Sequence, residues 1–192
     1  LGNTGYIVTT QNKWLLAFLA SRCAWYLISK TSIALGERAG VPRYRLVDQY
    51  MRPLPIPDVS ETEQKTLAKL ATALTDLAND RYQLHEKTRH RILTDLGTPD
   101  GKLNQKLTAW WSLTFTTFRR ELKKVFRQDI PVSERDEWDA WFSQRRAQHE
   151  QTTQAIIRLE TELNQHVYRL FDLTPAEIKL IEASTKYPYG EV

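Results

Sequence analysis

The sequence predicts a mostly α-helical protein, in which a small α+β N-terminal module is followed by a bundle or hairpin arm of long helices. Two observations lead to this class. Three prolines alternate in the segment Pro-Leu-Pro-Ile-Pro-Asp at 53–58, and proline stops a helix because it fixes φ and lacks a backbone donor. After this segment, apolar residues recur at three- and four-residue spacing, which is the period of an amphipathic helix. We therefore expect an N-terminal module over residues 1–57 and a helical bundle over residues 58–192.

The N-terminal module is expected to contain two strands and one helix. The stretch Tyr6–Thr10 is rich in β-branched residues, which favour strands. Residues 14–29 place apolar side chains at helical spacing on a wide face, so this helix must pack against other elements. The stretch Arg43–Val47 alternates polar and apolar residues, as a half-exposed strand does. Trp25 and Tyr26 suit the core of this module better than a platform for stacking bases.

Four helices are expected after the proline-rich segment. They are predicted at about 60–95, 103–128, 133–171 and 175–184. Ser60 with Glu63, and Thr174 with Glu177, have the spacing of a capping box, in which each side chain satisfies a free amide of the first helical turn. Ser133 is expected to cap the third of these helices.

The two longest predicted helices each carry a seam for packing against a partner helix. In the first, the seam positions follow a heptad spacing: Leu67, Leu70, Leu74, Leu77, Arg81, Leu84 and Thr88. In the other, they are Trp138, Phe142, Arg145, Thr152, Ile156, Leu159, Leu163, Val167 and Leu170. The helix between them is aromatic on one side and basic on the other, through Arg119, Arg120, Lys123 and Lys124. This basic side could touch phosphate, although such a run is more often a solvated face.

Positive charge is distributed unevenly along the chain. The 192 residues include 27 Lys and Arg against 23 Asp and Glu, a net charge of +4. Residues 1–60 hold seven basic and three acidic residues, whereas residues 61–192 hold twenty of each. A polyanionic partner would therefore meet the first third of the chain, and could also meet the middle, where residues 81–130 hold eleven basic and five acidic residues. Ordinary surface lysines and arginines would explain the same totals.

Basic side chains beside glycine turns form the candidate binding site of the N-terminal module. The candidate residues are Lys30, Arg38, Arg43, Tyr44, Arg45 and Arg52. An arginine can bind a phosphate through two parallel hydrogen bonds or read guanine in the major groove. The sequence therefore predicts a DNA contact here, with a solvated loop and strand edge as the alternative.

The sequence contains no recognisable catalytic or metal-binding pattern. It has no Gly-rich phosphate loop, no paired-cysteine spacing and no Gly-x-Ser-x-Gly motif. None of the four histidines has carboxylates at zinc-ligand spacing. His85 and His90 are five residues apart, which places them on different faces of their helix, whereas we expect His149 and His166 to be packed or at the rim of the third helix. Cys23 has no neighbouring His or Asp that would activate its thiol. We expect no catalytic residue, metal or cofactor in this chain.

The chain is expected to be cytoplasmic. Its single cysteine excludes an internal disulfide and fits a reducing compartment. The most apolar run, at 14–28, is too short to cross a bilayer and contains Arg22. No signal segment opens the chain. Because the chain begins with Leu1 and its one methionine is Met51, we expect it to be a piece of a longer polypeptide.

Several stretches have the order and character of a known family. They are Trp-Leu-Leu-Ala-Phe-Leu-Ala-Ser at 14–21, Leu-Pro-Ile-Pro at 54–57, the Trp-rich segment 107–126, and 163–178, which ends in Leu-Thr-Pro-Ala-Glu-Ile. They resemble the C-terminal specificity (target-recognition) and helical region of adenine-specific DNA methyltransferases of restriction–modification systems, especially the larger single-chain, type IIG-like members. The resemblance covers most of the chain. It departs from the family at Asn164, where the family has aspartate, and at Phe171-Asp172, where it has Tyr-Gly.

The resemblance implies that the chain recognises a DNA sequence and positions it for a methyltransferase domain upstream in the same polypeptide. Double-stranded DNA and that upstream domain are the implied partners. S-adenosylmethionine is implied for the parent enzyme, which could also cleave DNA, but not for this fragment. The family's Asn/Asp-Pro-Pro-Tyr/Phe motif has no counterpart here, and its base-reading positions cannot be carried over. Two alternatives remain: part of a non-catalytic specificity subunit, or a helical oligomerisation module with no DNA role.

Overall fold

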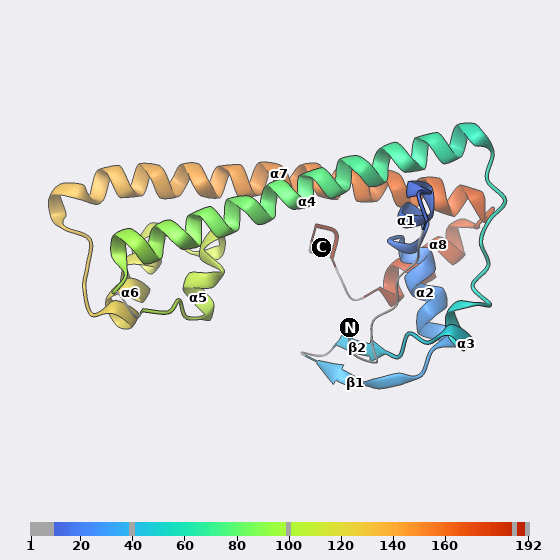
Figure 1. Ribbon diagram of the computed structural model, residues 1–192, viewed down its shortest axis with the longest axis horizontal. Helices are drawn as coiled ribbons and strands as arrows, with labels where there is room; N and C mark the ends of the chain where they lie inside the picture. Colours follow the sequence, from blue (N-terminus) through green and yellow to red (C-terminus); the bar gives the residue numbers. More distant parts are fainter. Residues whose placement is uncertain (1–9, 39–40, 99–100, 186–187, 191–192) are drawn as a thin grey trace. The chain divides into compact units, whose positions relative to one another are not determined.

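The computed structural model describes residues 10–38, 41–98, 101–185 and 188–190 (Figure 1). It is mostly helical with one small two-stranded sheet, as the sequence predicts. The predicted strand Tyr6–Thr10 lies outside the described residues except for Thr10. The chain forms two compact units: unit 1 comprises residues 1–76 and 156–192, and unit 2 comprises residues 77–155.

Two long helices, α4 (Glu61–Leu96) and α7 (Arg135–Leu170), confirm the first and third predicted helices (Figure 1). Within unit 1, Leu67 of α4 and Val167 of α7 are fully buried in the same core. Within unit 2, Ile92 of α4 shares a core with Phe142 of α7. The start of α4 thus packs against the end of α7, and the end of α4 against the start of α7, so the pair is antiparallel within each unit.

The predicted helix over 14–29 is two helices, α1 (Lys13–Leu19) and α2 (Arg22–Thr31). The break occurs at Ser21, whose backbone is extended and whose Oγ accepts a hydrogen bond from the amide of Ala24 at 3.2 Å. A serine in this conformation begins a new helix because its hydroxyl replaces a missing backbone acceptor. The single helix was therefore a wrong prediction, although its apolar residues are packed as expected.

A β-hairpin follows α2, formed by antiparallel strands β1 (Ala34–Arg38) and β2 (Val41–Tyr44). The register is irregular between Ala34 and Glu37, where Gly36 has a φ of 101° that favours glycine. The second strand begins two residues earlier than predicted and ends at Tyr44 rather than Val47. An isolated two-stranded ribbon is marginal in water, so its attachment to α2 matters.

A short helix, α3 (Asp48–Met51), packs against α2 and was not predicted. The proline-rich segment links it to α4; Leu54 within the segment and Val59 directly after it are buried. Val59 belongs to the same core as Phe18 of α1. The predicted border at residue 57 is therefore not a border between the compact units.

The predicted helix over 103–128 is also broken, into α5 (Gln105–Thr108), the 3-10 turn η1 (Trp110–Ser112) and α6 (Phe115–Phe126). The interruption before α6 has the same cause as the one at Ser21. Thr114 is extended, and its hydroxyl accepts from the amide of Thr117 at 3.2 Å, which begins a new helix. Sequence periodicity across the break reflected burial of the aromatic residues rather than one continuous helix.

The last part of the chain follows the prediction with one change at the start of α7. A 3-10 turn, η2 (Val132–Glu134), precedes α7 and contains Ser133, so the α-helix begins two residues after the expected cap. The final helix, α8 (Pro175–Ser184), has the predicted capping box, with Thr174 and Glu177 each satisfying the other's backbone amide.

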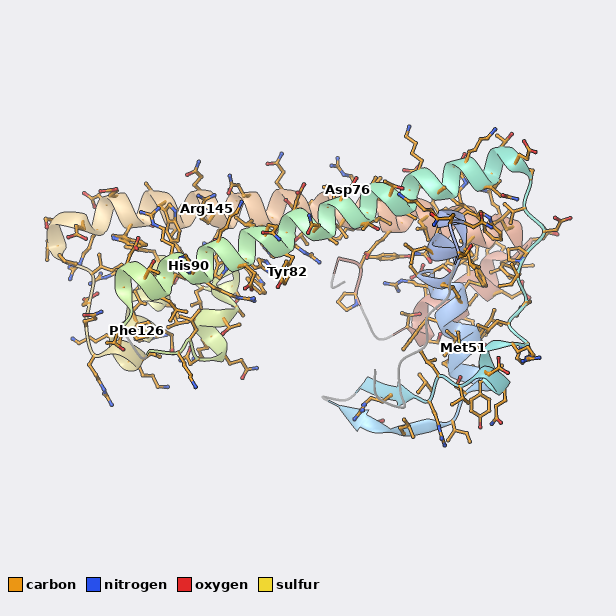
Figure 2. The ribbon with its side chains drawn as sticks, viewed as in Figure 1. Met51, Asp76, Tyr82, His90, Phe126 and Arg145 are labelled. Carbon is orange, nitrogen blue, oxygen red and sulfur yellow. The ribbon has the colours of Figure 1, made fainter. Side chains whose placement is uncertain are left out.

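Unit 2 is built around an aromatic core (Figure 2). Trp110, Phe118 and Phe142 are fully buried, and the rings of Phe118 and Phe142 stack with centroids 4.5 Å apart. Phe126, at the end of α6, belongs to the same core (Figure 2). Close packing of these rings holds α6 against both long helices inside the unit. Within the described residues, no helix is both long and apolar enough to cross a membrane.

Candidate nucleic-acid interface

The structure places the predicted site residues on neighbouring elements of unit 1. Lys30 lies in the last turn of α2, Arg43 and Tyr44 lie in β2, and Arg52 ends α3. The ring of Tyr44 packs edge-on against Trp25 of α2, with centroids 5.6 Å apart, and this contact fixes the hairpin to the helix. These elements contact one another within the unit, since β2 pairs with β1 and α3 packs against α2.

Backbone pairing sets the direction of the arginines on the hairpin. The amide of Arg45 donates to the carbonyl of Ile33 at 2.9 Å, which extends the pairing one residue beyond β2. Because side chains alternate along a strand, Arg43 and Arg45 belong to the same face of the ribbon. Arg38 ends β1, and its backbone is paired with Val41, but its side chain is outside the described residues.

The guanidinium groups of Arg43 and Arg45 are exposed. Among the described residues, neither has a carboxylate within ion-pair distance. Arg52 is also exposed and pairs with Asp48 at 2.8 Å, an interaction that water screens strongly. Lys30 extends over the ring of Tyr26, with its Nζ 5.1 Å from the centroid. These cations are accessible to a phosphate or to the acceptor edge of a guanine.

Exposed apolar side chains accompany the cations. Ile33, Leu35 and Leu46 on and beside the hairpin are 57%, 55% and 41% exposed. Exposed large apolar side chains are candidates for contact with a partner. The hairpin and the residues beside it thus carry both cations and exposed apolar groups.

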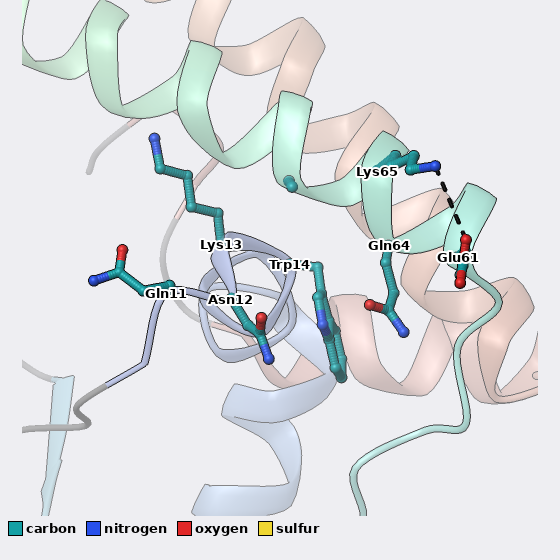
Figure 3. A pocket seen from close by; sticks show the side chains of 8 residues that line it. Gln11, Asn12, Lys13, Trp14, Glu61, Gln64 and Lys65 are labelled. Carbon is teal, nitrogen blue, oxygen red and sulfur yellow. Dashed lines mark ion pairs between the residues drawn. The ribbon is translucent and has the colours of Figure 1, made fainter.

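A separate cleft of about 440 Å³ lies in unit 1 between the start of α1 and the first turns of α4 (Figure 3). Its lining residues are Gln11, Asn12, Lys13, Trp14, Glu61, Gln64, Lys65 and Ala68. The side-chain amide of Gln64 donates to the carbonyl of Val59 at 2.8 Å, which leaves its oxygen as an acceptor. Local sequence gives no sign of this cleft, because the residues of α1 and those of α4 that line it are about fifty residues apart in the chain.

Two histidines meet in unit 2: His149 of α7, predicted to be a packed or rim residue, and His85 of α4. The Nε2 of His85 lies 2.9 Å from the Nδ1 of His149, and the His85 ring stacks on Trp111 with centroids 4.0 Å apart. Burial, with the nearby His149 as the next cause, lowers the pKa of His85 to about 4. No carboxylate is bonded to the pair in the described structure, and no group of three potential metal ligands was found there. Both rings pack within the aromatic cluster formed with Trp110 and Trp111.

Two tyrosines and an arginine of unit 1 share one carboxylate. The hydroxyls of Tyr168 and Tyr189 both donate to Glu182, at 2.7 and 2.6 Å, and Arg22 pairs with the same carboxylate at 2.7 Å. Burial, followed by the bond to Glu182, raises the pKa of both tyrosines. Burial also raises the pKa of the Cys23 thiol to about 11, so this thiol is protonated at neutral pH.

The fold and the interface together define an α-helical protein with two long antiparallel helices and an exposed basic hairpin. The chain belongs to a family described as Domain of unknown function (DUF8810), whose model matches residues 60–167. The match spans α4 to nearly the end of α7 and includes all of unit 2, but it excludes the hairpin. Among curated proteins and solved structures, no match to the chain was found.

Proposed function

We propose that this chain is the DNA sequence-recognition and positioning region of an adenine-specific DNA methyltransferase of a restriction–modification system. The observation that carries the proposal is the pair of exposed guanidinium groups, Arg43 and Arg45, on one face of a two-stranded ribbon. The major groove of DNA admits such a ribbon, and arginine is the side chain that most often reads guanine there. The sequence resemblance to target-recognition regions supports the same assignment.

The surrounding residues supply contacts that orient the ribbon. Lys30 and Arg52 flank it from α2 and α3 and would bind phosphates, which position a protein on DNA without reading its sequence. The contact of Tyr44 with Trp25 holds the ribbon at a defined angle to α2. In this proposal the helices act as the support and the hairpin makes the contacts.

The proline-rich segment acts as a stiff connection between the reading module and α4. Pro53, Pro55 and Pro57 restrict the backbone, while the buried side chains of Leu54 and Val59 anchor the segment to the protein. A connection of this kind keeps the hairpin in a fixed relation to the first turns of α4.

The catalytic methyltransferase domain and its S-adenosylmethionine site belong to another part of the parent polypeptide in this proposal. Double-stranded DNA and that domain are the partners, and the cytoplasm, where such enzymes meet DNA, is the location. The parent could also carry an endonuclease activity.

The test is duplex binding by the whole chain and by the double variant Arg43→Gln/Arg45→Gln. A control variant with the same loss of charge is Lys69→Gln/Arg158→Gln, because both residues are exposed and lie on the long helices. If Arg43 and Arg45 contact phosphates, the hairpin variant lowers the slope of log affinity against log salt by about 2. If either arginine reads a guanine, the hairpin variant also relaxes the sequence preference across a duplex library. Equal behaviour of the two variants in both measurements would refute the proposal.

A helical interaction module is the second candidate, and the exposed apolar residues of the hairpin favour it. Burial of Ile33, Leu35 and Leu46 in a protein interface would remove them from water without any DNA. A concentration-dependent dimer, together with no duplex binding at low salt, would support this candidate. A non-catalytic specificity subunit is distinguished by the upstream coding sequence, which would then lack a methyltransferase motif.

A further inference from the structure

One face of α6 carries a row of basic side chains that the hairpin does not involve. Arg120, Lys123, Lys124 and Arg127 occur at intervals of three, one and three residues, which places them on the same side of a helix with 3.6 residues per turn. All four side chains are exposed. We call these four residues the α6 basic face.

The orientation of this face is fixed by the opposite side of the helix. Phe118, Leu122 and Phe126 are buried in the aromatic core of unit 2. Glu121 is buried as well, and it accepts hydrogen bonds from Asn104 at 3.1 Å and from Lys106 at 3.3 Å. Because α6 cannot rotate without opening this core, the basic face stays directed towards solvent.

The neighbouring acidic groups have hydrogen-bonding partners outside the α6 basic face, and Glu121 also attracts Lys124 electrostatically. Asp129 binds Arg119 through two hydrogen bonds of 3.0 and 2.7 Å and also pairs with Arg135 at 3.2 Å. Among the residues that the structure describes, no carboxylate lies within ion-pair distance of the α6 basic face. Like charges three and four residues apart repel one another, so an anionic partner would relieve an existing repulsion.

We infer that the α6 basic face binds the sugar–phosphate backbone of duplex DNA, independently of base sequence. This inference rests on the proposed DNA role, but it assigns that role a second surface, in unit 2 and within the part of the chain that matches the family model. From Arg120 to Arg127 the helix rises about 10 Å, enough to face several phosphates, because each DNA strand carries one charge per 3.4 Å of axis.

A membrane surface fits the same face less well. A helix that lies on a membrane buries an apolar side in the lipid, beside its basic side. The apolar side of α6 is enclosed in the protein core, and the large apolar side chains that are exposed in the described residues lie on other elements. Charge alone, without accessible apolar groups, favours a polyanion such as DNA.

The test compares the triple variant Arg120→Gln/Lys123→Gln/Lys124→Gln with Lys69→Gln/Arg158→Gln/Lys179→Gln, which removes the same charge from exposed positions elsewhere. Arg127 is retained because it ends α6 in a left-handed conformation with φ 62°. The probe is a random-sequence duplex, titrated with each full chain between about 50 and 200 mM salt. The α6 variant should bind about tenfold or more weakly and lower the salt slope by about 2 to 3, and the control by clearly less.

Three outcomes would overturn the inference. In the first, the α6 variant and its control bind alike. In the second, the wild-type chain fails to bind the duplex at the lowest salt. In the third, phosphatidylserine vesicles, but not the duplex, bind wild type and release the α6 variant. The hairpin variant Arg43→Gln/Arg45→Gln keeps the two proposals separate. If only the hairpin variant binds the duplex more weakly than wild type, the α6 contact is refuted and the hairpin contact stands. If only the α6 variant binds more weakly, the hairpin contact is refuted and the α6 contact stands.

Discussion

The paired histidines of unit 2 should make the protein less stable in mild acid. The Nε2 of His85 and the Nδ1 of His149 are 2.9 Å apart, so one ring donates a hydrogen bond to the other. The pKa of each ring is lowered, chiefly by burial, which favours the neutral form of both at neutral pH. The His85 ring is also stacked on Trp111, away from bulk water, with Arg81 and Arg89 close enough to repel an added charge. Protonation of either ring to the charged imidazolium therefore destabilises the folded state.

The sign and the size of the effect follow from the pKa of His85. Burial, with His149 as the next cause, lowers this pKa from 6.5 to about 4. The unfolded chain therefore takes up the proton more readily, so stability is full above about pH 6.5 and falls as the pH drops towards about 4. The pKa difference between 6.5 and about 4 corresponds to about 3 kcal/mol of the free energy of unfolding. Because the ring is only half-buried, solvent screening reduces this to roughly 1–2 kcal/mol.

Urea unfolding at about pH 7.5 and pH 5 measures this effect and stays above the range in which most carboxylates titrate. Between about pH 7.5 and pH 5, the free energy of unfolding of the wild-type chain should fall by roughly 1 kcal/mol more than that of His85→Gln. His90→Gln is the matched control, because His90 is exposed on the same helix. The variant His85→Gln is expected to be less stable at both pH values, since it loses the stack on Trp111, so only the difference between the two pH values is diagnostic. Equal pH dependence in all three proteins would refute the reasoning.

Three further predictions concern the cores and a helix boundary. Phe142→Ala should destabilise unit 2 by about 3–5 kcal/mol, because it removes a fully buried ring stacked on Phe118; a loss below 1 kcal/mol in urea unfolding would contradict the packing. Ser21→Ala should cost about 1 kcal/mol through loss of the cap between α1 and α2, whereas the exposed control Ser112→Ala should cost less. Glu182→Ala should cost roughly 2 kcal/mol, since it removes the shared acceptor of Tyr168 and Arg22; a thermal melt equal to wild type would contradict this role.

Local sequence signals predicted the long helices and one of the caps well. The heptad leucines of α4 and the apolar seam of α7 predicted both ends of each helix to within two residues. The capping box of Thr174 and Glu177 is present as predicted. At Ser60 the hydroxyl accepts from the amide of Glu63, but the carboxylate of Glu63 lies 2.8 Å from His166. That contact depends on α7, which local sequence cannot reveal.

The breaks inside predicted helices show why periodicity alone was insufficient. Apolar residues continue across Ser21 and Thr114 because both sides of each break face the same core. The hydroxyl cap that starts a new helix at each position contributes only about 1 kcal/mol, so packing decides whether the chain turns there. Serine and threonine at these positions were visible signals, but each also occurs often within helices.

By itself, the sequence determined the helical class, the uneven charge and the interruption of helical structure at the proline-rich segment, and it provided the candidate residues of the hairpin. These properties depend on residues close together in the chain, where spacing directly indicates a face, a cap or a break. Only the tertiary structure decided which distant residues meet, including His85 with His149 and Arg22 with Glu182. It also decided that Arg119 is paired with Asp129 while Arg120, Lys123 and Lys124 remain exposed. The physical reason is that periodicity specifies the buried side of an element but not the partner that covers it.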